Sequence, residues 1–411
     1  MPRFFDHLMD ADEALALFLK HATPLSDREI VATEQAIGRV AARDITSPQP
    51  LPEFPRSTVD GYAVRQRDAA ACGPDCHVLL ALVGELPMGQ APAIDIGPGE
   101  TVLVHTGGML PRNADAVVML EDTELEGRAV TIMKEVRHGD NVIKVGEDVR
   151  PGQTVIPAGH RLRPQDIGGL LALGIIQIDV VRQPRVMIFS SGDEVIDPAD
   201  MTRPGQVRDV NSYTVFGLAQ QAGAVAERCG ILPDDLAVLR SALADAMAAR
   251  PDMIVLSAGS SVSDRDHTPT VLRELGQPGV LVHGIAIKPG KPTLLGAAGS
   301  TLLMGLPGNP MSAMVQFMIY GMPALYKQQG SALPSSKLLR LRLKQAWRSS
   351  AERAEYVPCR IEANETGEFE VRPIPYKSNL IFRLVEANGL FHVPQTTTLL
   401  EAGTQVDVRL F

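Results

Sequence analysis

Two lysines and two tight Gly/Pro turns lie close together in residues 284–312 and suggest an anion-binding site. Lys288 and Lys291 belong to a KPGKP turn, whose prolines restrict the path of the backbone. A second turn, GLPGNP, follows an apolar run at 301–306 and precedes a helical pattern with Asn309 at the N-cap position. Because a helix start presents free N–H groups and a positive dipole end, this segment predicts a site for phosphate or another oxyanion.

A plainer interpretation of the same segment is a pair of surface lysines beside an ordinary turn. The segment is not a P-loop, because Ile285 and Pro292 stand where that motif needs Gly and Ser or Thr. The choice between these interpretations depends on the elements that position the turns.

From residue 183 onward, apolar runs alternate with helical patterns. Strands are expected at 185–192, 252–259, 284–290 and 301–308, and helices at 211–223, 234–250, 268–276 and from Pro310. Such alternation indicates a doubly wound parallel sheet covered on both faces, whose ligands bind at the C-terminal ends of the strands. The candidate binding residues follow those ends: Ser190, Gly192, Asp193, Glu194, Gly259, Ser261, Asp266, Lys288, Gly290, Lys291, Pro307, Gly308 and Asn309.

The remaining sequence predicts three further parts around this α/β domain, which is assigned to 181–328. Residues 1–46 and 145–180 mix helical and strand patterns, with helices expected at 10–21, 36–45 and 164–174, and would form one discontinuous domain. Residues 47–144 begin with the proline-dense SPQPLPEFP, and their short apolar runs predict an inserted β-rich barrel or sandwich. Residues 329–411 contain five strand-like runs and predict a small β-barrel or sandwich.

The composition favours an ordinary globular protein of several domains. The chain has 411 residues, of which 45% are hydrophobic and 21% charged, and its net charge of −9 argues against nucleic acid or an anionic membrane as a partner. The N-terminus has no signal-peptide pattern, and no apolar run is long enough to span a membrane, so we expect a cytoplasmic protein. Cys72 and Cys76 with His77 lack the second half of a zinc site, which favours plain cysteines in a reducing compartment.

The candidate site combines carboxylates with lysines, hydroxyls and glycine amides. No Ser/His/Asp arrangement with nucleophile-elbow spacing is present, because Gly259-Ser260-Ser261 does not fit that motif. Carboxylates such as Glu194 and Asp266 would hold Mg²⁺, while lysines and amides would neutralise an anion. The residues therefore predict Mg²⁺-dependent phosphoryl or nucleotidyl chemistry.

A series of segments in a fixed order resembles the molybdopterin molybdenumtransferases, the family of bacterial MoeA and of the C-terminal domain of gephyrin. The segments are FPRSTVDGYAV, TGGMLPRNADAVV, VGEDVRPG, SSGDEV, GQVRDVNSY, AIKPGKPTLLG, GLPGNPMSA and EANGLFHVP, and they cover nearly the whole chain. The resemblance implies a MogA-like doubly wound α/β domain, an inserted β-rich domain and a C-terminal β-barrel. It also implies a homodimer with the site between subunits.

The activity implied by the resemblance is insertion of molybdenum from molybdate into adenylylated molybdopterin, with Mg²⁺ present and AMP released. The molybdopterin adenylyltransferase and apo-molybdoenzymes are the implied protein partners. By the same resemblance, Asp60, Thr106 and Asp148 are catalytic residues, and Glu194 and Asp266 are both catalytic and metal-binding. Lys288, Lys291 and Ser312 match oxyanion-binding positions, while Asp234 is a weaker match that we interpret as a helix N-cap.

Six positions depart from the family pattern: Val59, Ala258, Ser263, Pro358, Asn379 and Arg383. An oxyanion-binding Arg is common where Pro358 stands, and one hypothesis is that Arg383 restores its charge. The departures keep a second function open, a divergent non-catalytic paralogue that binds molybdopterin or nucleotide as an assembly protein. A nucleotide pyrophosphatase is a weaker alternative, and the sequence does not distinguish molybdate from tungstate.

Overall fold

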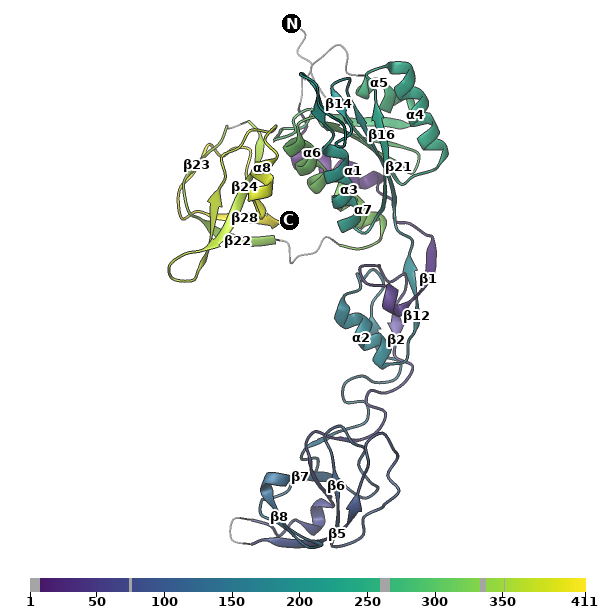
Figure 1. Cartoon of the computed structure of the whole chain (residues 1–411), viewed down its shortest axis with the longest axis vertical. Coiled ribbons are helices and arrows are strands. Elements are labelled where there is room, and N and C mark those ends of the chain that lie inside the picture. The colour runs from purple at the N-terminus through teal and green to yellow at the C-terminus, as the bar shows by residue number, and fades with distance from the viewer. Residues whose placement is uncertain (1–7, 74–75, 259–266, 333–337, 351) are drawn as a thin grey trace. The chain divides into compact units, whose positions relative to one another are not determined.

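The computed structural model describes residues 8–73, 76–258, 267–332, 338–350 and 352–411. The chain divides into two compact units (Figure 1). The first unit contains Met1–Ala42, Gly159–Arg163 and Ile178–Phe411, and the second contains Arg43–Ala158 and Pro164–Gln177. The finer division into four domains stays a prediction.

A six-stranded sheet is the centre of the first unit. Its strand order is β16-β13-β17-β21-β20-β18, and the first four strands are parallel, whereas β20 and β18 continue it antiparallel. The predicted parallel sheet is therefore confirmed, with an antiparallel extension at one side. The strands are β13 (Arg185–Ser191), β16 (Val225–Leu232), β17 (Met253–Ala258), β18 (Pro278–His283), β20 (Leu294–Ala298) and β21 (Thr301–Pro307).

Helices cover both faces of this sheet (Figure 1). Alternate residues of β17 face the two cores, Met253 and Val255 in one and Ile254 and Leu256 in the other, as expected for a strand buried on both sides. The first core is covered by α1 (Ala11–His21), α3 (Asn211–Gln221), α6 (Pro310–Gln316), the π-helical turn Phe317–Gly321 and α7 (Met322–Gln328). The second is covered by α4 (Leu236–Ala248) and α5 (Thr268–Glu274).

The C-terminal region forms a closed five-stranded barrel, as predicted. The strand order is β24-β25-β22-β28-β26, and a further pairing of β24 with β26 closes it. Its core contains Val357, Val371 and Phe391. The strands are β22 (Leu338–Leu343), β24 (Ala354–Ala363), β25 (Phe369–Pro373), β26 (Gly389–Val393) and β28 (Gln405–Leu410), with the short β23 (Trp347–Arg348), β27 (Leu399–Leu400) and helix α8 (Phe382–Glu386).

The second unit is built on another six-stranded sheet, of order β7-β4-β6-β5-β9-β8. Tyr62, Val118 and Val130 are buried in its core. Its strands are β4 (Gly61–Val64), β5 (Val78–Glu85), β6 (Glu100–Val104), β7 (Ala116–Met119), β8 (Thr123–Glu126) and β9 (Ala129–Ile132). The unit also contains helix α2 (Pro164–Ala172) and the short pairs β2 (Ile45–Thr46) with β11 (Thr154–Ile156) and β3 (Arg56–Ser57) with β10 (Val142–Ile143).

Two predicted elements are wrong. The helix expected at 36–45 is absent, because Val40 and Ala41 make β-bridges to Arg161 and Val180 instead. The strand expected at 284–290 is only β19 (Ile287–Lys288), which pairs with β24 of the barrel and not with the α/β sheet. The strand-like sequence at 28–35 forms β1 (Arg28–Ala32), whose pairing with β12 (Gln177–Val181) was not predicted. The short pair of β14 (Val195–Ile196) with β15 (Val207–Arg208) was not predicted either.

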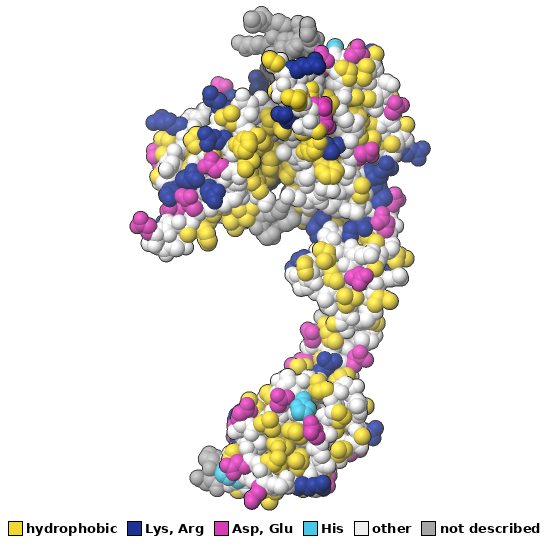
Figure 2. All heavy atoms as spheres, in the orientation of Figure 1, with side chains coloured by type: hydrophobic (Ala, Val, Ile, Leu, Met, Phe, Trp, Pro, Cys, Tyr) yellow, Lys and Arg dark blue, Asp and Glu magenta, His cyan; other side chains and the backbone are white. Residues whose placement is uncertain are grey.

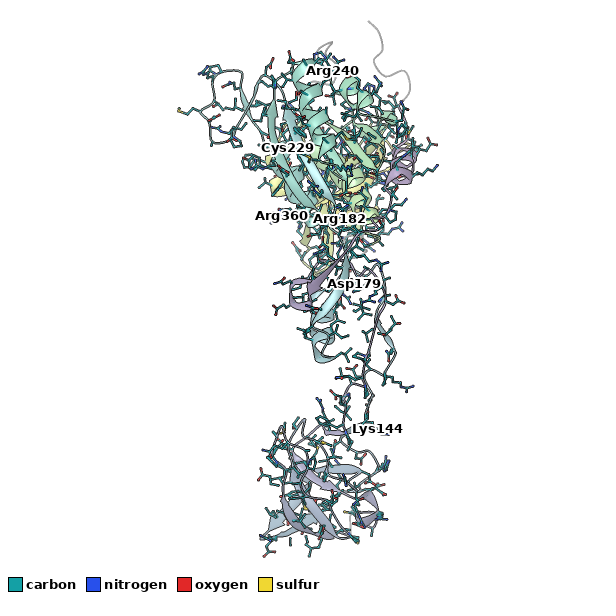
Figure 3. All side chains as sticks on the ribbon, turned by 90° about the vertical axis from the view of Figure 1, so that its right-hand side faces the viewer. Lys144, Asp179, Arg182, Cys229, Arg240 and Arg360 are labelled. Carbon is teal, nitrogen blue, oxygen red and sulfur yellow. The ribbon has the colours of Figure 1, made fainter. Side chains whose placement is uncertain are left out.

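Ion pairs away from the C-terminal ends of the strands connect neighbouring elements. Arg182 makes a two-pronged ion pair with Asp252 at 2.8 and 3.0 Å, and Arg240 on α4 does the same with Glu274 on α5 at 2.6 Å. Both arginines are labelled in Figure 3. Acidic and basic side chains are interspersed over the face shown in Figure 2. Within the described part of the chain, no helix has the length and apolar character needed to cross a membrane.

Candidate functional site

Three neighbouring strands of the α/β sheet end side by side. Ser191 of β13 pairs with Ala258 of β17, which pairs in turn with Pro307 of β21. Since all three strands are parallel, the loops that follow them meet at one edge, as the sequence predicts. A pocket of about 460 Å³ lies there, and its lining includes Ser190, Glu194, Asn211, Ser257, Gly308 and Asn309. We call it the strand-end pocket.

Two buried oxygens in the strand-end pocket have no hydrogen-bond partner among the described residues. Ser190 is 3% exposed and Asn211 is 7% exposed, yet neither Ser190 Oγ nor Asn211 Oδ1 is bonded to any residue that the structure describes. The amide nitrogen of Asn211 is occupied, since it donates to Ser257 Oγ at 2.8 Å and to the Gly308 carbonyl at 2.9 Å. Because unpaired buried polar atoms are costly, these two oxygens indicate a place for a polar ligand.

The loop after β13 positions Glu194 at this pocket. A Cβ at Gly192 would lie 2.9 Å from Glu194 Oε2, so a glycine is required for the carboxylate to keep its place. Asp193 faces the other way and accepts from the Asp234 amide at 3.1 Å. The interpretation of Asp234 as a helix N-cap is wrong: Asp235 caps α4, while Asp234 accepts from Ser191 Oγ at 2.7 Å.

A second pocket, of about 450 Å³, adjoins the first and shares Gly308 and Asn309 with it. Among the described residues that line it, four have cationic side chains and none has a carboxylate. We call it the cationic pocket. Its lining comprises Lys288, Lys291, Arg353 and Lys377 with Pro289, Gly290, Pro292, Pro307, Ser312, Tyr376 and Ser378. The structure thus brings Lys288, Lys291, Gly290 and Ser312 together, as the sequence analysis expects.

The KPGKP turn is held against the helix that follows β21. Gly290 has a φ of +109°, and a Cβ there would lie 2.5 Å from Gln316 Cδ. Gln316 is fully buried and donates its amide to the Pro289 carbonyl at 2.7 Å, and Thr293 Oγ1 donates to the Gly290 carbonyl at the same distance. Asn309 takes the N-cap position of α6 as predicted, although its side chain makes no capping bond.

Lys288 is bound to a fully buried carboxylate of the barrel. Its Nζ lies 2.7 Å from Glu355 Oε1, and Glu355 has 0% of its side chain exposed. Tyr376 OH donates to Glu355 at 2.8 Å, Trp347 Nε1 donates at 3.2 Å, and Ser349 Oγ is a further close donor. Four donors satisfy this carboxylate, which is the condition under which a buried charge is stable.

These donors determine the ionisation of the cluster. Burial alone raises the pKa of Glu355, but the bond from Lys288 and the three neutral donors outweigh it, so the pKa is lowered overall. Burial, followed by the Glu355 charge, raises the pKa of Tyr376, so the phenol stays protonated and remains a donor. Glu355 is therefore a carboxylate that faces an ammonium group.

In the second unit, the predicted residues Asp60 and Thr106 are hydrogen-bonded. Asp60 Oδ1 accepts from the Thr106 amide at 2.8 Å and from its hydroxyl at 3.2 Å. The Thr106 amide is the main cause of the lowered pKa of Asp60, helped by the nearby His105. His105 Nδ1 lies 3.7 Å from Asp60, and its Nε2 lies 2.8 Å from Glu85. Asp148 is exposed in a loop of the same unit.

The predicted residues Gly259, Ser261 and Asp266 lie outside the described residues. The fold also brings residues to the pockets that sequence reasoning missed. Asn211 lies within the matching segment GQVRDVNSY, which was a usable signal. Arg353 and Lys377 carried no such signal, because both belong to the C-terminal region, and Arg353 is brought to the cationic pocket by the pairing of β19 with β24.

Three family models match the chain in succession. The model of the MoeA N-terminal region (domain I and II) matches residues 9–174. The model described as a probable molybdopterin binding domain matches 187–327, and the model of the MoeA C-terminal region (domain IV) matches 340–411. Both pockets are lined by residues of the second and third matches.

Relatives of similar length support the same assignment. The molybdopterin molybdenumtransferase of Haemophilus influenzae is 31% identical, over 98% of this chain and 99% of its own length. The molybdopterin molybdenumtransferase of Nostoc sp. is 30% identical, over 92% of this chain and 88% of its own length. The crystal structure of the molybdopterin biosynthesis MoeA protein from Pyrococcus horikoshii has a TM-score of 0.79 at 32% identity, covering 98% of this chain and 99% of that one. The chain therefore belongs to the MoeA family and is an enzyme of molybdenum cofactor biosynthesis, a molybdopterin molybdenumtransferase.

Proposed function

We propose that the protein transfers molybdenum from molybdate to adenylylated molybdopterin and releases AMP. The observation that carries this proposal is the pair of adjoining pockets with a common wall at Gly308 and Asn309. The cationic pocket suits a compact tetrahedral dianion, which lysines and hydroxyls bind by charge and hydrogen bonding. The strand-end pocket, with its polar lining and unpaired oxygens, suits the larger organic substrate.

The two substrates would then lie next to each other. Lys291 and Ser312 would hold the oxyanion, while Ser190 and Asn211 would accept hydrogen bonds from the organic substrate. Holding both reactants in contact converts a bimolecular encounter into an effectively unimolecular step. The chain's contribution is thus positioning and charge neutralisation.

The strand-end pocket fits Mg²⁺ by the chemistry of its donors. Glu194 lines this pocket, and a carboxylate oxygen is a ligand that a hard cation prefers. Among the described residues no cluster of three His, Cys, Asp or Glu forms a complete metal site. In the proposal Glu194 and Asp266 hold the ion, which would neutralise phosphate charge when bound.

The resemblance extends this proposal to the rest of the molecule. The proposal includes the four-domain division and a homodimer with a site between subunits. It also includes catalytic roles for Asp60, Thr106 and Asp148. The bonded Asp60–Thr106 pair supports a defined position for that carboxylate. The alternative of a non-catalytic paralogue is not favoured, because relatives matching nearly the full chain are named molybdenumtransferases.

Reconstitution with purified components tests the proposal. The protein is mixed with adenylylated molybdopterin, Mg²⁺ and a series of molybdate concentrations, and AMP release and activation of an apo-molybdoenzyme are measured. We expect both to depend on molybdate, and Glu194→Gln to lower turnover, whereas Lys344→Ala, on the barrel surface, leaves it unchanged. Tight nucleotide binding without turnover at any molybdate concentration would contradict the proposal.

A further inference from the structure

The positive charge of Lys288 is already balanced within the protein. Its Nζ lies 2.7 Å from Glu355, a fully buried carboxylate that stays ionised because four donors surround it. An incoming oxyanion would therefore meet an ion pair at this wall and not an isolated cation. Other cations must supply most of the attraction that the cationic pocket exerts on a dianion.

Arg353 is well placed to supply this attraction for a dianion. It precedes β24, and the backbone beside it is fixed by the Ala354 amide, which donates to the Ala286 carbonyl at 2.9 Å, and by the pairing of Ile287 with Ala354. These contacts anchor Arg353 next to the KPGKP turn, and the residue lines the cationic pocket. Among the described residues, no carboxylate lies within ion-pair distance of its guanidinium.

Neither position singled out in the sequence for this charge provides it. Pro358 is buried in β24 opposite Leu390 and carries no charge. Arg383 lies on α8 with its Nη1 3.3 Å from Glu386, and it is not among the residues that line the cationic pocket. Of the described residues that line this pocket, Arg353 is the one with a guanidinium group.

We propose that Arg353 is an oxyanion-binding residue of this protein and provides the guanidinium contact that Pro358 cannot make. The proposal rests on the function proposed above, since it names a further residue of the same pocket. A planar guanidinium can donate two parallel hydrogen bonds to two oxygens of a tetrahedral dianion, which a lysine cannot do. Arg353 would thus add directional binding to the charge of Lys291 and Lys377.

Calorimetric titration of the full-length protein with molybdate and with tungstate tests the proposal. We expect Arg353→Ala to weaken binding of both oxyanions about 10- to 100-fold, the loss of one charge-assisted contact. Arg353→Lys should recover part of the loss, because it restores the charge without the two-pronged geometry. The matched control is Arg360→Ala, since Arg360 (labelled in Figure 3) is exposed on β24, the strand that Arg353 precedes, and is not among the residues that line the cationic pocket.

Failure of this inference is distinguishable from failure of the proposed function. The variant Lys291→Ala tests whether the cationic pocket binds the oxyanion at all. Thermal unfolding of each variant shows whether that variant is folded. If Lys291→Ala weakens oxyanion binding while Arg353→Ala and Arg353→Lys bind as the unmodified protein does, the role of Arg353 is overturned. If the unmodified protein binds neither oxyanion, the proposed function fails and the inference fails with it.

Discussion

At the scale of single residues, the most informative contact is the one between Lys288 and Glu355. A motif in the sequence identifies the lysine, but only the fold reveals that a buried carboxylate balances its charge. Burying that carboxylate is costly, and the bonds from Lys288, Tyr376, Trp347 and Ser349 offset the cost. The same bond joins the barrel to the turn that lines the cationic pocket, so stability and site geometry are linked.

Replacement of Glu355 by Gln tests this link through pH. We expect the free energy of unfolding to fall by about 2 to 3 kcal/mol near neutral pH, less than for a fully buried pair because Lys288 is 37% exposed. The folded-state pKa of Glu355 is lowered, so its stabilisation is complete above the ordinary value of 4.5 and is lost as pH falls through the folded pKa. The gap between variant and unmodified protein should therefore close in acid, as measured by denaturant unfolding.

A surface pair that includes another residue of β24 provides the control for this measurement. Glu362 bonds Lys344 at 2.9 Å and both side chains are partly exposed, so Glu362→Gln should lower the free energy of unfolding much less than Glu355→Gln does. A stability gap for Glu355→Gln that is constant from neutral to acid pH would show that Glu355 is not an ionised partner of Lys288.

At the scale of elements, the sequence was a good guide to the three adjacent parallel strands of the sheet. The runs at β13, β17 and β21 were predicted, and their adjoining ends form the strand-end pocket. The strands β16 and β18 were missed because they are the outermost strands of the sheet, and their partly exposed residues break the continuous apolar pattern. The strand β20 is buried throughout and was also missed, because its short sequence LLGAA lacks the β-branched residues that are typical of strands.

Prediction from sequence was weakest where the pairing partner is distant in the chain. The residues at 284–290 have an apolar pattern that suits a strand of the α/β sheet, but Ile287 and Lys288 pair with Ala354 and Glu355 of the barrel. Local patterns carry no information about such a partner, so the barrel residues of the cationic pocket, Arg353 among them, were not foreseen. The predicted residues of the KPGKP and GLPGNP turns are nevertheless at the two pockets.

Gly290 tests how strongly the KPGKP turn depends on its contact with the helix behind it. A Cβ at this position would lie 2.5 Å from Gln316 Cδ, and the backbone has a φ of +109°, so Gly290→Ala must displace the turn or the helix. We expect molybdate affinity in calorimetry to fall at least about tenfold, the effect of losing about 1.4 kcal/mol of binding free energy.

A glycine in open space is the matched control for that substitution. Gly217 lies within α3, and a Cβ there would meet nothing within 4 Å, so Gly217→Ala should leave affinity unchanged and stabilise the helix by about 0.5 to 1 kcal/mol. If Gly290→Ala bound molybdate as tightly as the Gly217 variant, the close packing of the turn would not be needed for the site.

At the scale of the whole molecule, both pockets lie within segments that the family models match. The three family models cover residues 9–174, 187–327 and 340–411, and the two pockets are formed by elements of the second and third. The barrel contributes Arg353, Tyr376, Lys377 and Ser378 to the cationic pocket and Asn379 to the strand-end pocket. In our proposal the C-terminal region is therefore part of the site and not only a structural addition.

The central claim is that the cationic pocket binds the oxyanion that donates the metal. Crystals of the protein soaked in tungstate test it directly, because tungsten gives a strong anomalous scattering signal. We predict the strongest anomalous peak in the pocket lined by Lys291, Ser312 and Arg353, next to the Gly308–Asn309 wall. A pocket without a peak, with tungstate bound instead among Glu194, Asn211 and Ser257, would contradict the assignment of the two pockets.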